Sequence, residues 1–191
     1  MSEPLHQRLN KVLPRIIADD FLSGSGIGNE IACYIFDYPP EDELKVRDHL
    51  RVLQDHIPKQ KPGLRVAYVN MFDLVLEYLK VRNLLEKALQ MQKEKGDAAL
   101  KKALEAPLHE SKIGAVFADV VRPDQQDLIL MSGVGSVWPL LRSHTLLSNL
   151  HSVIGKTPLV MFYPGRYDGQ SLRLFGKLKN NNYYRAFKLI P

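Results

Sequence analysis

Two short segments of the sequence carry residue types that could bind a ligand, and the first is a glycine-containing turn. Gly133, Gly135 and Ser136 fall between a predicted strand and a predicted helix. In that context backbone N–H groups and the start of a helix can hold an anion such as phosphate, and Arg142, two turns into the helix, could add a positive charge. The complete phosphate-loop motif and a third glycine at dinucleotide spacing are both absent. The turn is therefore either a degenerate nucleotide-binding loop or a close strand-to-helix connection.

The second segment comes after the last predicted strand. Arg166, Tyr167 and Asp168 lie just beyond its carboxyl end, where open α/β sheets place their binding sites. A loop with these three side chains could bind a ligand or a partner chain. The alternative is a plain turn, in which Asp168 and Gly169 reverse the chain and Tyr167 covers the core.

Positive charge is concentrated at the end of the chain. Residues 166–191 contain six Lys or Arg side chains, Arg185 among them, against one acidic side chain, whereas the whole chain has a net charge of +5. Aromatic residues are interleaved with these cations, a composition that suits phosphates and stacked bases. The other interpretation is that the apolar residues belong to the core and that the cations form a solvated face or a partner contact.

The residues that could bind a metal or act in catalysis do not occur at the spacings that such sites require. His49 and His56 are seven residues apart, as are His144 and His151, and no further ligands accompany either pair. A zinc site needs three or four ligands, so no metal site is predicted. Cys33 lies in an apolar strand, where a buried and inert thiol is expected. The sequence predicts no enzyme activity and no cofactor.

Apolar patterning predicts the elements that position these segments. Helices are expected at 4–22, 41–57, 72–94, 98–105 and 137–154, and strands at 32–38, 64–71, 127–131 and 158–163. Pro14 should kink or interrupt the first helix, a polar turn is expected at 90–97, and the run 113–121 fits a helix or a strand. This alternation predicts an α/β fold with a mainly parallel sheet of four or more strands flanked by helices.

Composition is typical of a soluble globular protein, with 45% hydrophobic and 25% charged residues in a chain of 191. We expect a single domain over 1–191, in which 1–30 form an N-terminal helix and a flexible connection and 166–191 form a basic, aromatic C-terminal segment. One cysteine excludes an internal disulfide. No apolar run approaches the roughly 20 residues of a membrane helix. Because the first residues are polar and unlike a signal peptide, a cytoplasmic protein is predicted.

Five segments taken together resemble the BrxB family. They are 35–44 (IFDYPPEDEL), 133–144 (GVGSVWPLLRSH), 163–169 (YPGRYDG), 174–176 (LFG) and 182–187 (NYYRAF). The resemblance extends over nearly the whole chain in order and in length. It implies a component of BREX, a bacteriophage exclusion system that methylates host DNA and blocks phage replication. The companions that it implies are the methyltransferase PglX, the phosphatase-fold protein PglZ and the large ATPase BrxC.

The resemblance brings no catalytic residues with it, in keeping with the missing catalytic motifs. We therefore expect a non-enzymatic scaffold or adaptor that binds PglZ foremost, and PglX or BrxC as further partners. The expected contacts are Arg166, Tyr167, Asp168 and Arg185. Two alternatives stay open: a degenerate nucleotide-binding domain, and a subunit that binds nucleic acid directly through its C-terminal segment.

Overall fold

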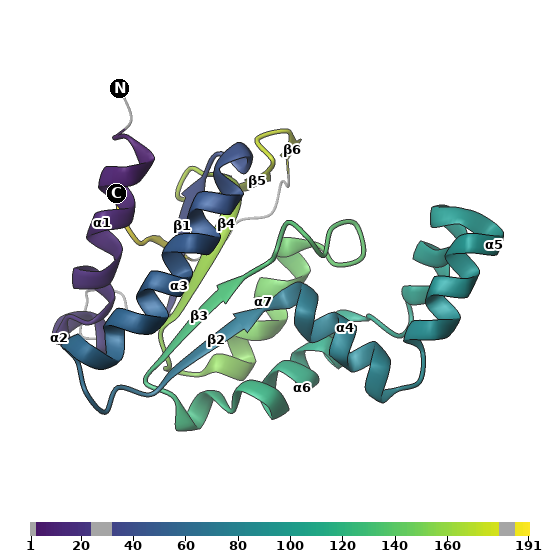
Figure 1. The fold of residues 1–191 in the computed structure, drawn as a ribbon, viewed down its shortest axis with the longest axis horizontal. Coiled ribbons are helices and arrows are strands. Elements are labelled where there is room, and N and C mark those ends of the chain that lie inside the picture. Colours follow the sequence, from purple (N-terminus) through teal and green to yellow (C-terminus); the bar gives the residue numbers. More distant parts are fainter. Residues whose placement is uncertain (1–2, 24–31, 180–185) are drawn as a thin grey trace.

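A parallel β-sheet forms the centre of the computed structural model, which describes residues 3–23, 32–179 and 186–191 (Figure 1). The strands of this sheet are β1 (Cys33–Tyr38), β2 (Val66–Asn70), β3 (Leu128–Ser132), β4 (Leu159–Tyr167) and β7 (Phe187–Lys188). Their spatial order is β2-β3-β4-β1-β7, and every neighbouring pair is parallel. The prediction of an α/β fold with a mainly parallel sheet is confirmed, and the four expected strands are all present.

Helices cover both faces of the sheet because its inner strands are apolar on both sides. All residues of β1 are buried. Since side chains alternate along a strand, Tyr34 and Phe36 join the core on one face and Cys33 and Ile35 join the core on the other.

The first face is covered by the N-terminal part of the chain. Its helices are α1 (Leu5–Ile16), α2 (Asp19–Leu22) and α3 (Glu43–Gln60), with a short 3-10 turn, η1 (Pro40–Asp42), before α3. Val12 and Ile16 of α1 are buried beside Leu53 of α3 in one apolar cluster. Helix α1 continues for two residues beyond Pro14, so the expected interruption falls at the end of this helix. The predicted flexible connection lies almost wholly outside the described residues.

The second face is covered by the helices that come after β2 and β3 in the chain. They are α4 (Met71–Val81), α5 (Leu85–Leu104), α6 (Glu110–Val121) and α7 (Ser143–Ile154), with the 3-10 turn η2 (Pro123–Gln125) before β3. The ambiguous run 113–121 is thus helical, and Ile113 and Phe117 bury the same face of α6. Figure 1 shows α5 projecting away from the sheet. No helix in the described part of the chain is long and apolar enough to span a membrane.

The long helix predicted at 72–94 is two helices. Asn83 adopts a left-handed backbone conformation (φ 53°) between α4 and α5, and this conformation ends the first helix. The polar turn expected at 90–97 is reduced to a kink at Gly96, where φ is 78°. Helical spacing of leucines continues across Asn83, so apolar periodicity alone could not reveal the break.

β4 is longer than predicted and continues into an antiparallel extension. The strand β5 (Leu172–Leu174) pairs with the end of β4, and β6 (Leu178–Lys179) pairs with β5. Pro164 and Gly165, which were expected to end the strand at 163, lie within it. A Cβ atom on Gly165 would lie only 2.2 Å from the carbonyl oxygen of Arg173, so the close approach of β5 requires glycine here.

Candidate interaction surface

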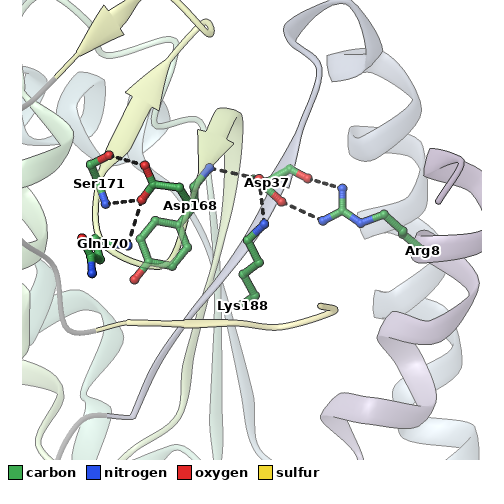
Figure 2. A network of polar contacts seen from close by, with 7 residues as sticks. Arg8, Asp37, Asp168, Gln170, Ser171 and Lys188 are labelled. Carbon is green, nitrogen blue, oxygen red and sulfur yellow. Dashed lines mark hydrogen bonds and ion pairs between the residues drawn. The ribbon is translucent and has the colours of Figure 1, made fainter. Parts of the chain in front are cut away.

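A buried carboxylate fixes the carboxyl end of the sheet (Figure 2). Asp37, at the end of β1, is only 8% exposed. Its side chain accepts hydrogen bonds from Arg8 Nη2 at 2.7 Å and from the Tyr167 N–H at 3.0 Å. Arg8 Nη1 donates to the Asp37 carbonyl oxygen at 2.7 Å, and Lys188 Nζ lies 4.0 Å from the carboxylate. Because a buried carboxylate must be compensated by charges and donors, these contacts tie α1, β4 and β7 to β1.

The turn after β4 is closed by its own side chains. Asp168 Oδ1 accepts hydrogen bonds from the backbone N–H groups of Gln170 at 2.9 Å and Ser171 at 2.7 Å, and Oδ2 accepts one from Ser171 Oγ at 2.7 Å. These donors, with a contribution from the nearby Arg173, hold the pKa of Asp168 well below its usual range. The carboxylate therefore fixes the turn that joins β4 to β5.

The predicted contact residues divide into exposed and buried groups. Arg166 is exposed, and its side chain has no hydrogen bond or ion pair with any described residue. The expectation that Tyr167 presents a contact is wrong, because its side chain is 1% exposed and its hydroxyl donates to the Ala186 carbonyl oxygen at 2.7 Å. Asp168 is exposed but is engaged in its turn. Arg185 lies outside the described residues.

Register places a second cation beside Arg166. In the antiparallel extension Arg166 faces Arg173, and Arg173 faces Lys179. Arg166 and Arg173 are both exposed. Like charges directly opposite one another on neighbouring strands destabilise the pair. The alignment therefore leaves positive charge that an anionic group could neutralise, beyond the electrostatic interaction of Arg173 with Asp168.

An aromatic pair lies next to these cations. Trp138 is 43% exposed and meets the Phe175 ring edge-on at a centroid distance of 6.0 Å. Phe175 donates its N–H to the Pro164 carbonyl oxygen at 2.9 Å, and the side chains of these two residues meet over Gly135. Alternation along β4 puts Pro164 and Arg166 on the same face. We call this surface, made of Arg166, Arg173, Phe175 and Trp138, the cation–aromatic face.

The glycine turn leads into further turns instead of the predicted helix. Residues 134–141 form successive turns, and the helix expected from 137 begins at Ser143, so Gly133 and Gly135 do not lead directly into a helix. Apolar spacing could not distinguish successive turns from a helix here, because Val137 and Leu141 are buried in the turns as they would be in a helix.

A cation from another element contacts this turn. Arg142 is exposed and lies at the N-cap of α7. Ser136 Oγ instead accepts a hydrogen bond from Arg47 Nη2 of α3 at 3.3 Å, and Arg47 Nε donates to Glu43 at 2.8 Å. Gly133, with φ 73°, allows close approach to Asn70, the N-cap of α4. These contacts favour a connecting role for the turn, and the nucleotide-binding alternative loses the helix start on which it relied.

Residues with catalytic potential are sparse in the described part of the chain. Burial raises the pKa of the Cys33 thiol to about 12, so the thiolate is disfavoured. Burial also lowers the pKa of His49, whose Nε2 is buried without a partner among the described residues. No three His, Cys, Asp or Glu side chains within residues 3–23, 32–179 and 186–191 gather as a metal site would require.

Sequence reasoning missed Asp37, although a signal was present. It is the one charged residue in β1, an otherwise buried strand, and such a residue requires compensation. Its partners Arg8 and Lys188 come from opposite ends of the chain, so no local pattern could identify them. Trp138 was noted within a motif but not linked to the Arg166 segment, because that link runs through Phe175 and the register of β5.

Comparison with known proteins gives one consistent result. The family model described as "BREX protein BrxB" matches residues 67–189. A protein of that name from Escherichia coli O9:H4 (strain HS) is 42% identical over 192 aligned residues, which cover 100% of this chain and 94% of the relative. Another from Bacillus cereus (strain H3081.97) is 40% identical over 190 residues, covering 97% of each chain. No solved structure matches this chain.

Proposed function

Because the chain belongs to the BrxB family and is a component of a BREX phage-defence system, we propose that it is a non-enzymatic adaptor for other BREX proteins, with PglZ as its principal partner. PglX and BrxC are further partners in this proposal. The cation–aromatic face makes the contact with PglZ.

The observation that carries this proposal is one surface that presents exposed Trp138, packed on Phe175, and exposed Arg166, whose side chain has no partner among the described residues. Tryptophan and arginine are enriched among the residues that dominate the energy of protein interfaces, since both combine a large contact area with directed hydrogen bonding. Tyr167 contributes indirectly, because its buried side chain holds β4 in place and thereby orients Arg166.

Rigidity supports the same interpretation. The Asp37 contacts and the Asp168 turn hold β4 and β5 in one geometry, so partner binding would cost little ordering of the backbone. The raised pKa of Cys33 and the Arg47 contact at the glycine turn fit an adaptor better than a catalyst.

Charge reversal on the cation–aromatic face tests this function. We expect the double variant Arg166→Glu/Arg173→Glu to lose co-purification with PglZ, because two favourable charges become repulsive. The matched control is Lys87→Glu/Lys93→Glu, which reverses two exposed charges on α5 and should keep the complex. Equal recovery of PglZ with the two double variants would refute the assignment of this face.

Direct nucleic-acid binding is the second candidate, and the Arg166–Arg173 row next to an exposed tryptophan favours it. Cations would contact phosphates and Trp138 would stack on a base. Trp138 is the single tryptophan of the chain, so its fluorescence reports on this face alone. Quenching by an oligothymidylate, with affinity that falls steeply as salt rises, would place nucleic acid ahead of PglZ at this surface.

A further inference from the structure

A second surface, separate from the cation–aromatic face, lies at the edge of the sheet that β2 forms. β2 pairs only with β3 among the described strands, so its outer side is open. The Arg65 carbonyl oxygen accepts a hydrogen bond from the Leu128 N–H at 3.2 Å. Since main-chain groups alternate in a parallel ladder, those of Val66 and Tyr68 point away from β3.

This edge lacks the features that usually prevent strand addition. Exposed edges are commonly blocked by charged side chains, proline or a bulge. The strand Val66–Asn70 reads VAYVN and contains neither a charge nor a proline. Arg65, just before it, is held in an ion pair with Asp127 at 2.6 Å. The edge of β2 is therefore chemically able to accept another strand.

A groove of about 1000 Å³ runs beside β2, between α3 on one side and α4 with α6 on the other. Figure 1 shows these helices on the two sides of β2 and β3. Side chains of an added strand would point alternately toward α3 and toward the wall made by α4 and α6. Val81 and Val120 on that wall are 72% and 65% exposed, and a ligand could cover them.

Charge distinguishes the two walls. On the α4–α6 wall, Asp73 and Asp119 are exposed and have no ion pair with any described residue. The same wall holds one arginine, Arg82 at the C-cap of α4, which lies over the Tyr78 ring at 6.0 Å from its centroid. The arginines of the α3 wall are already engaged, Arg47 with Glu43 and Arg51 with Asp48. Carboxylates therefore outnumber the one arginine on the α4–α6 wall, next to its exposed valines.

We propose that the open edge of β2 takes up an extended segment of a partner protein as an added strand, and that this segment carries Lys or Arg at alternate positions. The apolar stems of these side chains would cover Val81 and Val120 while their charged ends approach Asp73 and Asp119. Main-chain hydrogen bonds to Val66 and Tyr68 would supply affinity, as in other strand additions. This site gives the adaptor a second contact and does not depend on the function proposed for the cation–aromatic face.

A second copy of this chain is a poor occupant. Two β2 strands related by a two-fold axis would run antiparallel and place their α4–α6 walls side by side. Asp73 and Asp119 of one copy would then face the same carboxylates of the other, and like charges oppose such pairing.

The test uses the full chain and a fluorescent peptide that alternates Lys with Val. We expect saturable binding by anisotropy, and no binding of the matched peptide that alternates Glu with Val. A Lys–Val peptide that is N-methylated on alternate backbone amides distinguishes strand addition from charge attraction alone. It keeps the charges but cannot donate main-chain hydrogen bonds to β2. Equal binding of the methylated peptide, or of the Glu–Val peptide, would overturn the proposal.

Variants of the protein give an independent readout. Asp119→Lys should weaken the Lys–Val peptide about tenfold, since one attraction is replaced by a repulsion. Asp119 is in the last turn of α6, where a cation suits the helix dipole, so folding should be preserved. The control Glu94→Lys reverses an exposed charge on α5, outside the groove, and should bind as the wild type does. Equal weakening by Asp119→Lys and Glu94→Lys would exclude the groove as the peptide-binding site. A wild-type dimer that Val120→Lys converts to a monomer would also overturn the proposal, because a second copy would then occupy the groove.

Discussion

At the scale of single residues, Asp37 links segments that are far apart in the sequence. Arg8 comes from α1, Tyr167 from β4 and Lys188 from β7, and all three interact with one carboxyl group. Figure 2 shows this group at the end of β1, between Arg8 and Lys188. A compensated charge of this kind specifies one arrangement of its partners, because alternative packings would leave it unpaired in the interior.

Removing this carboxylate tests its structural role. Asp37→Ala should lower the free energy of unfolding by about 3 kcal/mol, because Arg8 loses its charge partner in a largely buried position. Urea unfolding followed by circular dichroism gives the value. Asp124→Ala, at an exposed position in η2, is the control and should change stability by less than about 0.5 kcal/mol. Similar losses in the two variants would show that Asp37 contributes no specific stabilisation.

At the scale of elements, the antiparallel extension of β4 determines which side chains reach the surface. The alternation Gly165-Arg166-Tyr167 in a strand puts Arg166 outside and Tyr167 inside. The contact-loop interpretation gave the wrong exposure for Tyr167, whereas the alternative, in which Tyr167 covers the core, gave the right one. The four long strands could be predicted from their apolar runs, whereas β5, β6 and β7 have three residues or fewer and too little pattern to detect.

Two glycine-to-alanine substitutions compare a glycine that leaves no room for a Cβ atom with a helical glycine that does. Gly165→Ala should destabilise the protein by about 1–3 kcal/mol, because the new Cβ would meet the Arg173 carbonyl oxygen. Gly114→Ala, inside α6, meets its nearest side-chain atoms at 3.8 Å and should stabilise by about 0.5–1 kcal/mol through helix propensity. A melting temperature that stays the same or rises in Gly165→Ala would contradict this account of the antiparallel extension.

At the scale of the whole molecule, the fold presents two separate contact surfaces on one sheet. The cation–aromatic face lies on the extension of β4, and the groove borders β2, with β3 between these strands. Helical and strand patterns were sufficient to predict the α/β class and the parallel sheet. Strand order and register were not predictable, because both depend on contacts between distant residues. The two surfaces therefore emerge only from the three-dimensional arrangement.

The most direct test of the central claim is the mass of the complex with PglZ. Both proteins are co-expressed, and size-exclusion chromatography with light scattering is run at low and physiological salt. The adaptor account predicts one peak whose mass is the sum of the two chains in a fixed ratio, and which persists at physiological salt. Two separate peaks at both salt concentrations would contradict it.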